Sequence, residues 1–216
     1  MLKQLRPAIM SVLVFTILTG LIFPFAITGI AEAIFPKQAK GSLIQQEGKI
    51  IGSELIGQNF ALPGYFHPRP SNAGSGYDAA NSGGTNLGPT SDKLINGIHK
   101  KTADGKDDPG NFDGIKDLAE AYRKENELAA DAQVPADAVT RSASGLDPQI
   151  SPGNAALQIS RVAKTRGLTA DTIKKIVADN TAGRQLGLLG EPGVNVLKVN
   201  LELDKAAPGK AGGSGK

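Results

Sequence analysis

The sequence contains no cysteine and only two histidines, His67 and His99. The lack of cysteine excludes disulfides and thiolate chemistry, but it fits both the cytosol and an oxidising compartment. Neither histidine has a second ligand at metal-binding spacing, so we predict no metal site. The sequence also lacks a G-x-S-x-G elbow and a G-x-x-x-x-G-K-[ST] phosphate loop. It therefore indicates no catalytic residue and no hydrolase chemistry of its own.

Long runs of basic residues are also missing, and the formal net charge is only +3. No aromatic residues alternate with Lys or Arg as a base-stacking surface requires, which argues against nucleic acid as a partner. The string "GSGYDA", residues 74–79, matches a G-x-G-x-x-A fingerprint by letters. Because neither a strand before it nor a helix after it is predicted, we interpret this match as chance.

One long apolar run is present, "PAIMSVLVFTILTGLIFPFAITGIA", residues 7–31, and it contains no charged residue. As a helix it is ~37 Å long, against a bilayer core of ~30 Å. We predict a transmembrane helix surrounded by membrane lipid. Pro24 predicts a kink, and Gly20 allows a neighbouring helix to come close. Both are candidate partner-interface residues.

A cleavable signal peptide is the alternative, because Lys3 and Arg6 precede the run and "AEA", residues 31–33, is a small-x-small pattern. The run is about twice the length of a signal-peptide core, which favours a retained anchor. Basic residues flank both ends, but the nearest lie on the N-terminal side, whereas the C-terminal flank begins with Glu32. We predict a cytoplasmic N-terminus and an extracytoplasmic soluble domain.

The rest of the chain predicts an α+β domain, in which helices cover a small sheet. Two strands are expected around Glu47-Gly48, and an amphipathic helix over residues 115–128. Ser151 and Thr169 are expected to cap two successive helices, with Gly167 ending the first and Gly183 just beyond the second. The alternating pattern of residues 194–203 predicts a half-buried strand. These elements give a membrane anchor (residues 1–36), a soluble domain (residues 37–205) with a surface excursion at residues 96–114, and a disordered tail (residues 206–216).

Two features of the soluble domain attract attention. Residues 65–90, "YFHPRPSNAGSGYDAANSGGTNLGPT", combine turn-forming residues with aromatic and charged side chains, so linker, phosphate cradle and shaped surface are all open. The second feature is the pair Gln158 and Arg161, which lie three positions apart on one helical face. Such a pair can grip a phosphate, a carboxylate or a partner's backbone, or it can simply belong to a solvated helix face.

Several longer strings together resemble one bacterial family, the C subunit of the Kdp-type potassium-transporting P-type ATPase. They are "GSELIGQNF", "YFHPRPS", "YDAANSGGTNLGPT", "VPADAVTRSASGLDPQISPGNAALQISRVAKTRGL" and "LGEPGVNVLKVNLELD", in the family's order behind one N-terminal span. They cover most of the chain. The region around residues 99–114, which looks longer than the family's usual connection, and the Gly-rich tail depart from the pattern.

The resemblance implies a non-catalytic subunit of an inner-membrane pump that hydrolyses ATP to import potassium. The implied partners are a channel-like potassium-binding subunit and an ATP-hydrolysing subunit. The family is described as a catalytic chaperone that raises ATP affinity, and the glutamine proposed to contact nucleotide corresponds to Gln158, with Arg161 beside it. Tyr65, Phe66, Arg69 and Asn86 belong to the family's strings, and we expect them at a partner interface in an ordered loop.

A physical difficulty accompanies that implication. A domain outside the cytoplasmic membrane cannot bring Gln158 to cytosolic ATP. The predicted topology and the nucleotide role of Gln158 therefore exclude each other. The other role consistent with the family is packing over the channel-like subunit, which stabilises the assembly or shapes ion entry. From another class, a free-standing anchored protein that binds a small anionic ligand through the Gly-rich loop is the alternative function.

Overall fold

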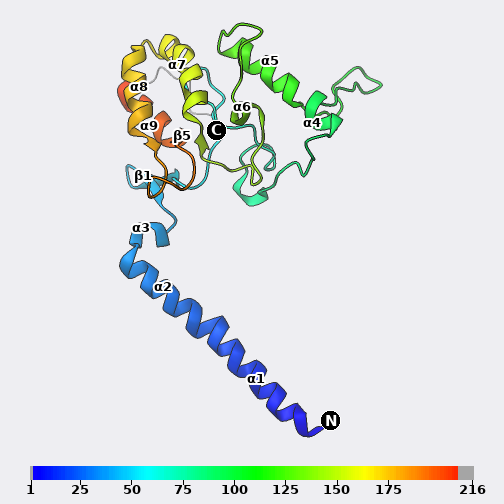
Figure 1. The fold of residues 1–216 in the computed structure, drawn as a ribbon, viewed down its shortest axis with the longest axis vertical. Helices are drawn as coiled ribbons and strands as arrows, with labels where there is room; N and C mark the ends of the chain where they lie inside the picture. Colours follow the sequence, from blue (N-terminus) through cyan, green and yellow to red (C-terminus); the bar gives the residue numbers. More distant parts are fainter. Residues whose placement is uncertain (1, 209–216) are drawn as a thin grey trace. The chain divides into compact units, whose positions relative to one another are not determined.

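The computed structural model describes residues 2–208. The chain divides into two compact units, residues 1–53 and residues 54–216. An apolar helix near the N-terminus is followed by further helices and short strands (Figure 1). This arrangement confirms the predicted α+β class with one N-terminal membrane-span candidate.

The first unit is dominated by one continuous apolar helix, Leu5–Ile34, of 30 residues. It follows a single turn, η1 (Leu2–Gln4), and consists of α1 (Leu5–Ile17), the π-helical η2 (Leu18–Ile22) and α2 (Phe23–Ile34). At 1.5 Å per residue it is ~45 Å long, which is enough to cross a bilayer with some tilt. The helix predicted over residues 7–31 is therefore confirmed, with a few more residues at each end.

The π-helical turn lies directly before Pro24. Proline has no backbone N–H to donate, and its ring crowds the carbonyl four residues earlier, here that of Gly20. In the structure the N–H of Phe23 donates to the carbonyl of Leu18, five residues back. The wider turn is a known accommodation to such crowding, and it lets the helix continue through the proline.

A short helix and a hairpin complete the first unit. They are α3 (Pro36–Ala39), β1 (Leu43–Gln46) and β2 (Lys49–Ser53). The two strands pair antiparallel, with Gln46 opposite Lys49. Glu47 and Gly48 both have positive φ, +51° and +76°, as a two-residue hairpin turn requires. The predicted hairpin is confirmed.

The second unit begins with a long stretch that is mostly irregular. It contains η3 (Ala79–Asn81) and α4 (Asp92–Asn96). Within it, the Ser71 hydroxyl accepts hydrogen bonds from the N–H groups of Ala73 and Tyr77 and donates to the carbonyl of Gly145. The Phe66 ring is fully buried. The loop was expected to be ordered, packed either on its own domain or against a partner, and these contacts hold it on its own domain.

The predicted surface excursion folds back on itself. Single antiparallel bridges join Ile98 to Phe112 and Lys101 to Asp107. After it come α5 (Ile115–Glu125) and the short α6 (Ala136–Val139), which pack against each other. The helix predicted over residues 115–128 is confirmed and ends three residues earlier than expected.

Three helices and a small antiparallel sheet make up the C-terminal part of this unit. The sheet has the order β3-β5-β4, with β3 (Gln149–Ile150), β4 (Thr181–Ala182) and β5 (Gly193–Asn195). The helices are α7 (Pro152–Arg166), α8 (Ala170–Asp179) and α9 (Val196–Ala206). Contacts run from α7 to α8, from α8 to α9, and from β5 to both α7 and α9 (Figure 1).

The predicted caps of the first two helices are confirmed. The side chains of Ser151 and Thr169 accept hydrogen bonds from the backbone N–H groups of Asn154 and Thr172. Gly167 ends α7 in the left-handed conformation at φ +65°, which costs glycine little because it has no Cβ.

The strand predicted over residues 194–203 is wrong, because the chain turns into α9 after Asn195. The Asn195 side chain accepts a hydrogen bond from the N–H of Lys198 and so caps a helix that begins at Val196. Buried side chains then recur at helical spacing, at positions 196, 199, 200 and 203. Only β5 remains extended.

The hydrophobic core lies between these three helices and the sheet. The side chains of its members are buried from solvent. They are Phe66, Ile150, Ala155, Val162, Ile173, Val177, Val194, Val196, Val199 and Leu203. A second cluster, around Tyr122, Ala138 and Val139, joins α5 and α6 to Leu157 of α7. Of the predicted disordered tail, Ala206 still belongs to α9 and Ala207 is buried, and residues 209–216 lie outside the described residues.

Candidate functional site

Gln158 of α7 lies at the centre of a buried hydrogen-bond network and is only 1% exposed. Its Nε2 donates to the His67 carbonyl at 3.1 Å and to Asn154 Oδ1 at 2.8 Å. Its Oε1 accepts from the His67 N–H and from Arg161 Nη2, both at 2.7 Å. A glutamine amide has two N–H groups and two lone pairs, so every one of its hydrogen bonds is made within the chain.

Arg161 lies one turn further along α7 and is 8% exposed. Its Nη1 donates to the carbonyls of Pro63 and Tyr65, at 2.6 and 2.9 Å, and its Nε donates to Asn126 Oδ1 at 3.0 Å. Burial lowers the pKa of Arg161 below its ordinary value, while the negative charge of Glu125 opposes that change. An arginine keeps its charge even so. Gln158 and Arg161 therefore fasten the loop segment 63–67 to α7.

His67 connects the same loop to α5. Its Nδ1 lies 2.9 Å from Glu125 Oε1, and its Nε2 lies 3.0 Å from the carbonyl oxygen of Leu62. Through its two ring nitrogens, His67 therefore joins the Leu62 carbonyl to the Glu125 carboxylate. Burial alone raises the pKa of Glu125, but the hydrogen bond and charge of His67, with the charge of Arg161, lower it below its ordinary value.

Arg69 ties the loop to the turn before β3. Its Nη1 lies 2.8 Å from Asp147 Oδ2, and its Nε and Nη2 donate to the Thr140 carbonyl at 3.3 Å. The Tyr77 hydroxyl donates to the carbonyl of Arg69 at 3.0 Å. At this part of the loop, α5 holds the His67 side chain, α7 holds the His67 backbone, and residues 140–147 hold the side chains of Arg69 and Ser71.

These residues line an open cleft of about 460 Å³. Its walls include His67, Arg69, Tyr77, Glu125 and Gln158. Among the residues that the structure describes, no buried side-chain nitrogen or oxygen lacks a hydrogen-bond partner. The chemistry of this cleft is therefore that of an ordered, hydrogen-bonded surface whose charged groups are already paired.

Comparison with known proteins identifies the family. The sequence profile described as "K+-transporting ATPase, c chain" matches residues 5–205. The chain belongs to this c-chain family. A relative from Mycobacterium tuberculosis (strain ATCC 25618 / H37Rv), named "Potassium-transporting ATPase KdpC subunit", is 48% identical over 205 residues, covering 95% of this chain and all of the relative. A relative of the same name from Bradyrhizobium diazoefficiens is 49% identical over 219 residues, covering 96% and 99%.

The residues predicted to lie at a partner interface are found at different places in the structure. Phe66 is fully buried in the core, and Tyr65 is 8% exposed, with its hydroxyl donating to Asp204 Oδ2 at 3.0 Å. A partner surface cannot reach the Phe66 ring in this arrangement. Asn86 is exposed, with φ +54°. Gly20 and Pro24 lie on the apolar helix, where both are exposed.

The burial of the two aromatics has a physical reason that the sequence did not reveal. The Tyr65 ring packs against Phe60, with centroids 5.2 Å apart, and the Arg166 guanidinium lies over it at 4.7 Å. Arg166 itself is fully buried and bonds Asp204. The turn-rich composition of residues 65–90 suggested a surface segment. Arg166 and the hydrophobic core instead keep the start of this segment buried.

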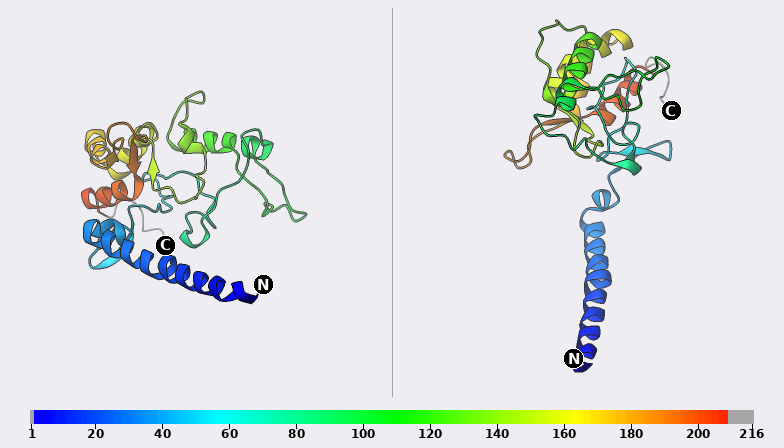
Figure 2. Two further views of the ribbon diagram at one scale, coloured as in Figure 1. Left: turned by 60° about the horizontal axis from the view of Figure 1, so that its bottom comes forward. Right: turned by 90° about the vertical axis from the view of Figure 1, so that its right-hand side faces the viewer.

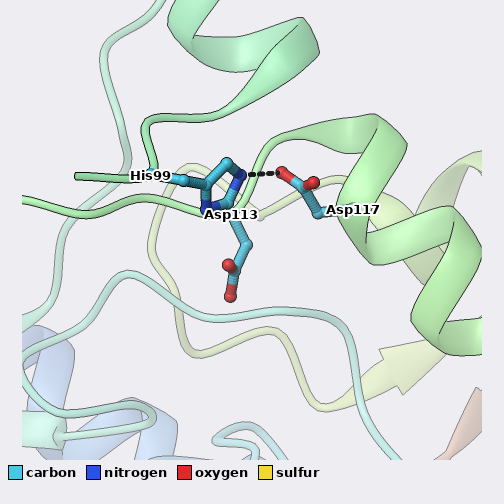
Figure 3. Close-up of side chains that lie close together, drawn as sticks. All are labelled: His99, Asp113 and Asp117. Atoms are coloured by element: carbon cyan, nitrogen blue, oxygen red, sulfur yellow. Dashed lines mark hydrogen bonds and ion pairs between the residues drawn. The ribbon is translucent and has the colours of Figure 1, made fainter. Parts of the chain in front are cut away.

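A grouping of His99, Asp113 and Asp117 was also missed, because the excursion brings together residues that are apart in the sequence. One possible metal-ligand atom from each lies within 4.8 Å of the others. In Figure 3, His99 Nε2 points to Asp117 Oδ2 at 3.0 Å, whereas the Asp113 carboxylate points away from both. Asp117 Oδ2 also accepts from the N–H of Gly114, which lowers the pKa of Asp117, with His99 adding to the effect. These contacts cap α5.

Proposed function

We propose that this chain is a non-catalytic accessory subunit of an ATP-driven potassium importer and acts by stabilising the assembly. Its partners in this proposal are a channel-like potassium-binding subunit and an ATP-hydrolysing subunit, with potassium as the transported ion of the complex. Membership of the c-chain family and the names of the relatives support the complex. The observation that supports the stabilising role is that Gln158 makes all four of its hydrogen bonds within the chain.

The second candidate role is that of a catalytic chaperone that raises the ATP affinity of the hydrolysing subunit. In that role Gln158 and Arg161 contact nucleotide, so both must give up bonds that hold residues 63–67 on α7. An unmade bond in a buried group costs about 1–3 kcal/mol, which a nucleotide contact must first offset. The bonds therefore favour the stabilising role.

We further propose that the chain crosses a bacterial inner membrane once, with its N-terminus in the cytoplasm and its second unit outside. The apolar helix Leu5–Ile34 supports a single span. Lys3 lies just before this helix and Arg6 in its first turn, so basic residues mark its N-terminal end. This orientation keeps residues 54–216 away from cytosolic ATP.

Assembly is tested by purifying the full chain through a C-terminal tag in mild detergent from cells that carry the whole pump operon. Large multi-span proteins should be recovered with it, and repeated recovery of the chain alone contradicts the proposal. Orientation is tested by reporters fused after Lys216, one active only in the cytoplasm and one only outside. Activity of the cytoplasmic reporter contradicts the stabilising role outside the membrane and revives nucleotide contact through Gln158.

The alternative of a free-standing protein that binds a small anion has less support. Arg69, which lines the cleft, and Arg161, which bonds Gln158 of the cleft wall, both donate to acceptors of the chain itself. A thermal-shift series with inorganic phosphate and with ATP separates this alternative, because bound ligand raises the melting temperature by mass action. We expect a flat response to both.

A further inference from the structure

An arm of ten residues, residues 183–192, projects from the second unit between β4 and β5 and carries three exposed leucines. Leu186, Leu188 and Leu189 are 90%, 80% and 60% exposed. In the right-hand view of Figure 2 this orange segment extends beyond the rest of its unit. The leucines are unusual there, because the only other exposed large hydrophobic residues among the described residues of this unit are Leu55 and Ile56, which are 62% and 40% exposed.

The arm is an ordered structure at both its base and its tip. At the base, Ala182 pairs with Gly193 in the small sheet, whose central strand reaches the core through Val194. Above it, Arg184 Nη2 lies 2.8 and 2.7 Å from the two carboxylate oxygens of Glu191. At the tip, the N–H of Gln185 donates to the Leu189 carbonyl at 2.8 Å. The leucines are therefore presented on a supported hairpin.

The backbone at the tip adds a second observation. Leu186 has φ +53°, a left-handed conformation that is rare for a bulky residue and costs about 1 kcal/mol or more. Asparagine or glycine suits that conformation better. Neither backbone preference nor burial within the described chain accounts for a leucine at this position. A contact outside the chain does account for it.

We propose that residues 183–192 insert the three leucines into an apolar groove on another protein subunit of the same pump. This inference rests on the proposed function, because it requires that the chain work within a complex. The arm is electrically balanced, since its only cation, Arg184, is paired with Glu191. The groove it fits is therefore uncharged and has room for three leucine side chains.

The composition of the arm favours a protein groove over a lipid surface. Segments that bind at the membrane interface combine apolar residues such as Leu, Phe or Trp with free Lys or Arg, which contact anionic headgroups, and Trp and Tyr are enriched at that depth. The string "GRQLGLLGEP" has no aromatic residue, and its one basic side chain is neutralised. Leucines on a rigid turn instead match the apolar anchors that fill pockets at protein interfaces.

The absence of native cysteine permits a direct test. Leu188→Cys is labelled with a polarity-sensitive fluorophore in the full chain, and emission and iodide quenching are measured in the intact pump and in nanodiscs that hold this subunit alone. We expect a blue shift and protection from quenching only in the pump. Protection in the nanodiscs that hold this subunit alone, whether or not the label is also protected in the pump, identifies lipid as the partner and overturns the proposal. A label that is exposed in both samples also overturns it.

A variant series provides an independent readout. Leu186→Ser, Leu188→Ser and Leu189→Ser together should make the subunit dissociate from the purified pump at least ~10-fold faster. The matched control is Leu55→Ser, which alters a leucine that is 62% exposed elsewhere in the unit. If the triple variant dissociates at the wild-type rate while wild-type pump is recovered intact, the proposed docking of residues 183–192 is wrong. The proposed function is then unaffected. Failure to recover wild-type pump contradicts the proposed function itself.

Discussion

Gln158 lies at the centre of the candidate site, and its side chain makes four hydrogen bonds there. Removing its amide leaves the His67 N–H, the His67 carbonyl and Arg161 Nη2 without the partner they have in the folded chain. Asn154 Oδ1 loses one of its two donors and keeps the Tyr122 hydroxyl. We predict that Gln158→Ala lowers the free energy of unfolding by about 2–3 kcal/mol, because buried polar groups without partners cost about 1–3 kcal/mol each. Thermal or denaturant unfolding of the detergent-purified chain, followed by circular dichroism, measures this.

The control lies on the same helix. Ser160→Ala changes an exposed position of α7 and should move the unfolding free energy by less than ~0.5 kcal/mol. If Gln158→Ala proves as mild as Ser160→Ala while the ATP dependence of the assembled pump changes, the structural role is wrong and the nucleotide role is supported.

The pair Glu125 and His67 makes stability depend on pH. Because the pKa of Glu125 is lowered in the folded chain, the stabilisation is complete above the ordinary glutamate value, about 4.3, and is lost as pH falls through the lower folded value. We predict that the melting temperature falls more steeply below that pH in the wild type than in Glu125→Gln. Glu127→Gln alters an exposed glutamate paired with Lys164 and should keep the wild-type profile. Equal slopes in all three proteins contradict the assignment.

At the scale of elements, α9 depends on a cap within an apolar string. Asn195 accepts from the Lys198 N–H through its side chain and donates to the carbonyl of Glu54. We predict that Asn195→Ala costs about 1–2 kcal/mol of unfolding free energy, because it removes the cap and a partly buried hydrogen bond. Asn195→Ser keeps a capping oxygen and should recover about half of the loss. Identical losses in both variants, measured by denaturant unfolding, count against the cap.

Local signals explain which elements the sequence predicts correctly. Ser151 followed by Pro152, and Thr169 two residues after Gly167, stand at junctions where polarity changes, so the starts of α7 and α8 can be recognised. Asn195 instead lies between valines, and the alternation of residues 194–203 fits a strand and a helix almost equally well. Contacts with α8 and β5 decide in favour of the helix, and those contacts are not encoded within any short window.

The candidate site shows the same limit. The pairing of Gln158 with Arg161 follows from helical spacing, and the structure confirms that they share a face. Their partners cannot be predicted in this way, because the carbonyls of Pro63 and Tyr65 lie about a hundred positions earlier in an irregular loop. The burial of Phe66 and Tyr65 likewise depends on Arg166, which a sequence pattern places at a helix end in solvent.

At the scale of the whole molecule, Gly20 tests whether the apolar helix serves assembly as well as anchoring. Beyond the neighbouring backbone of its own helix, a Cβ at Gly20 meets no atom of the described residues within 4 Å. The same holds for Gly29, nine residues further and on a nearly opposite side. Leucine favours both the helix and the bilayer, so insertion should be unaffected. If a partner helix approaches at Gly20, Gly20→Leu should reduce recovery of the pump by about fivefold, a cost of ~1 kcal/mol, and Gly29→Leu should not. Quantified co-purification from membranes with equal subunit levels measures this. Equal recovery of the two variants shows that the helix is an anchor without a partner at Gly20.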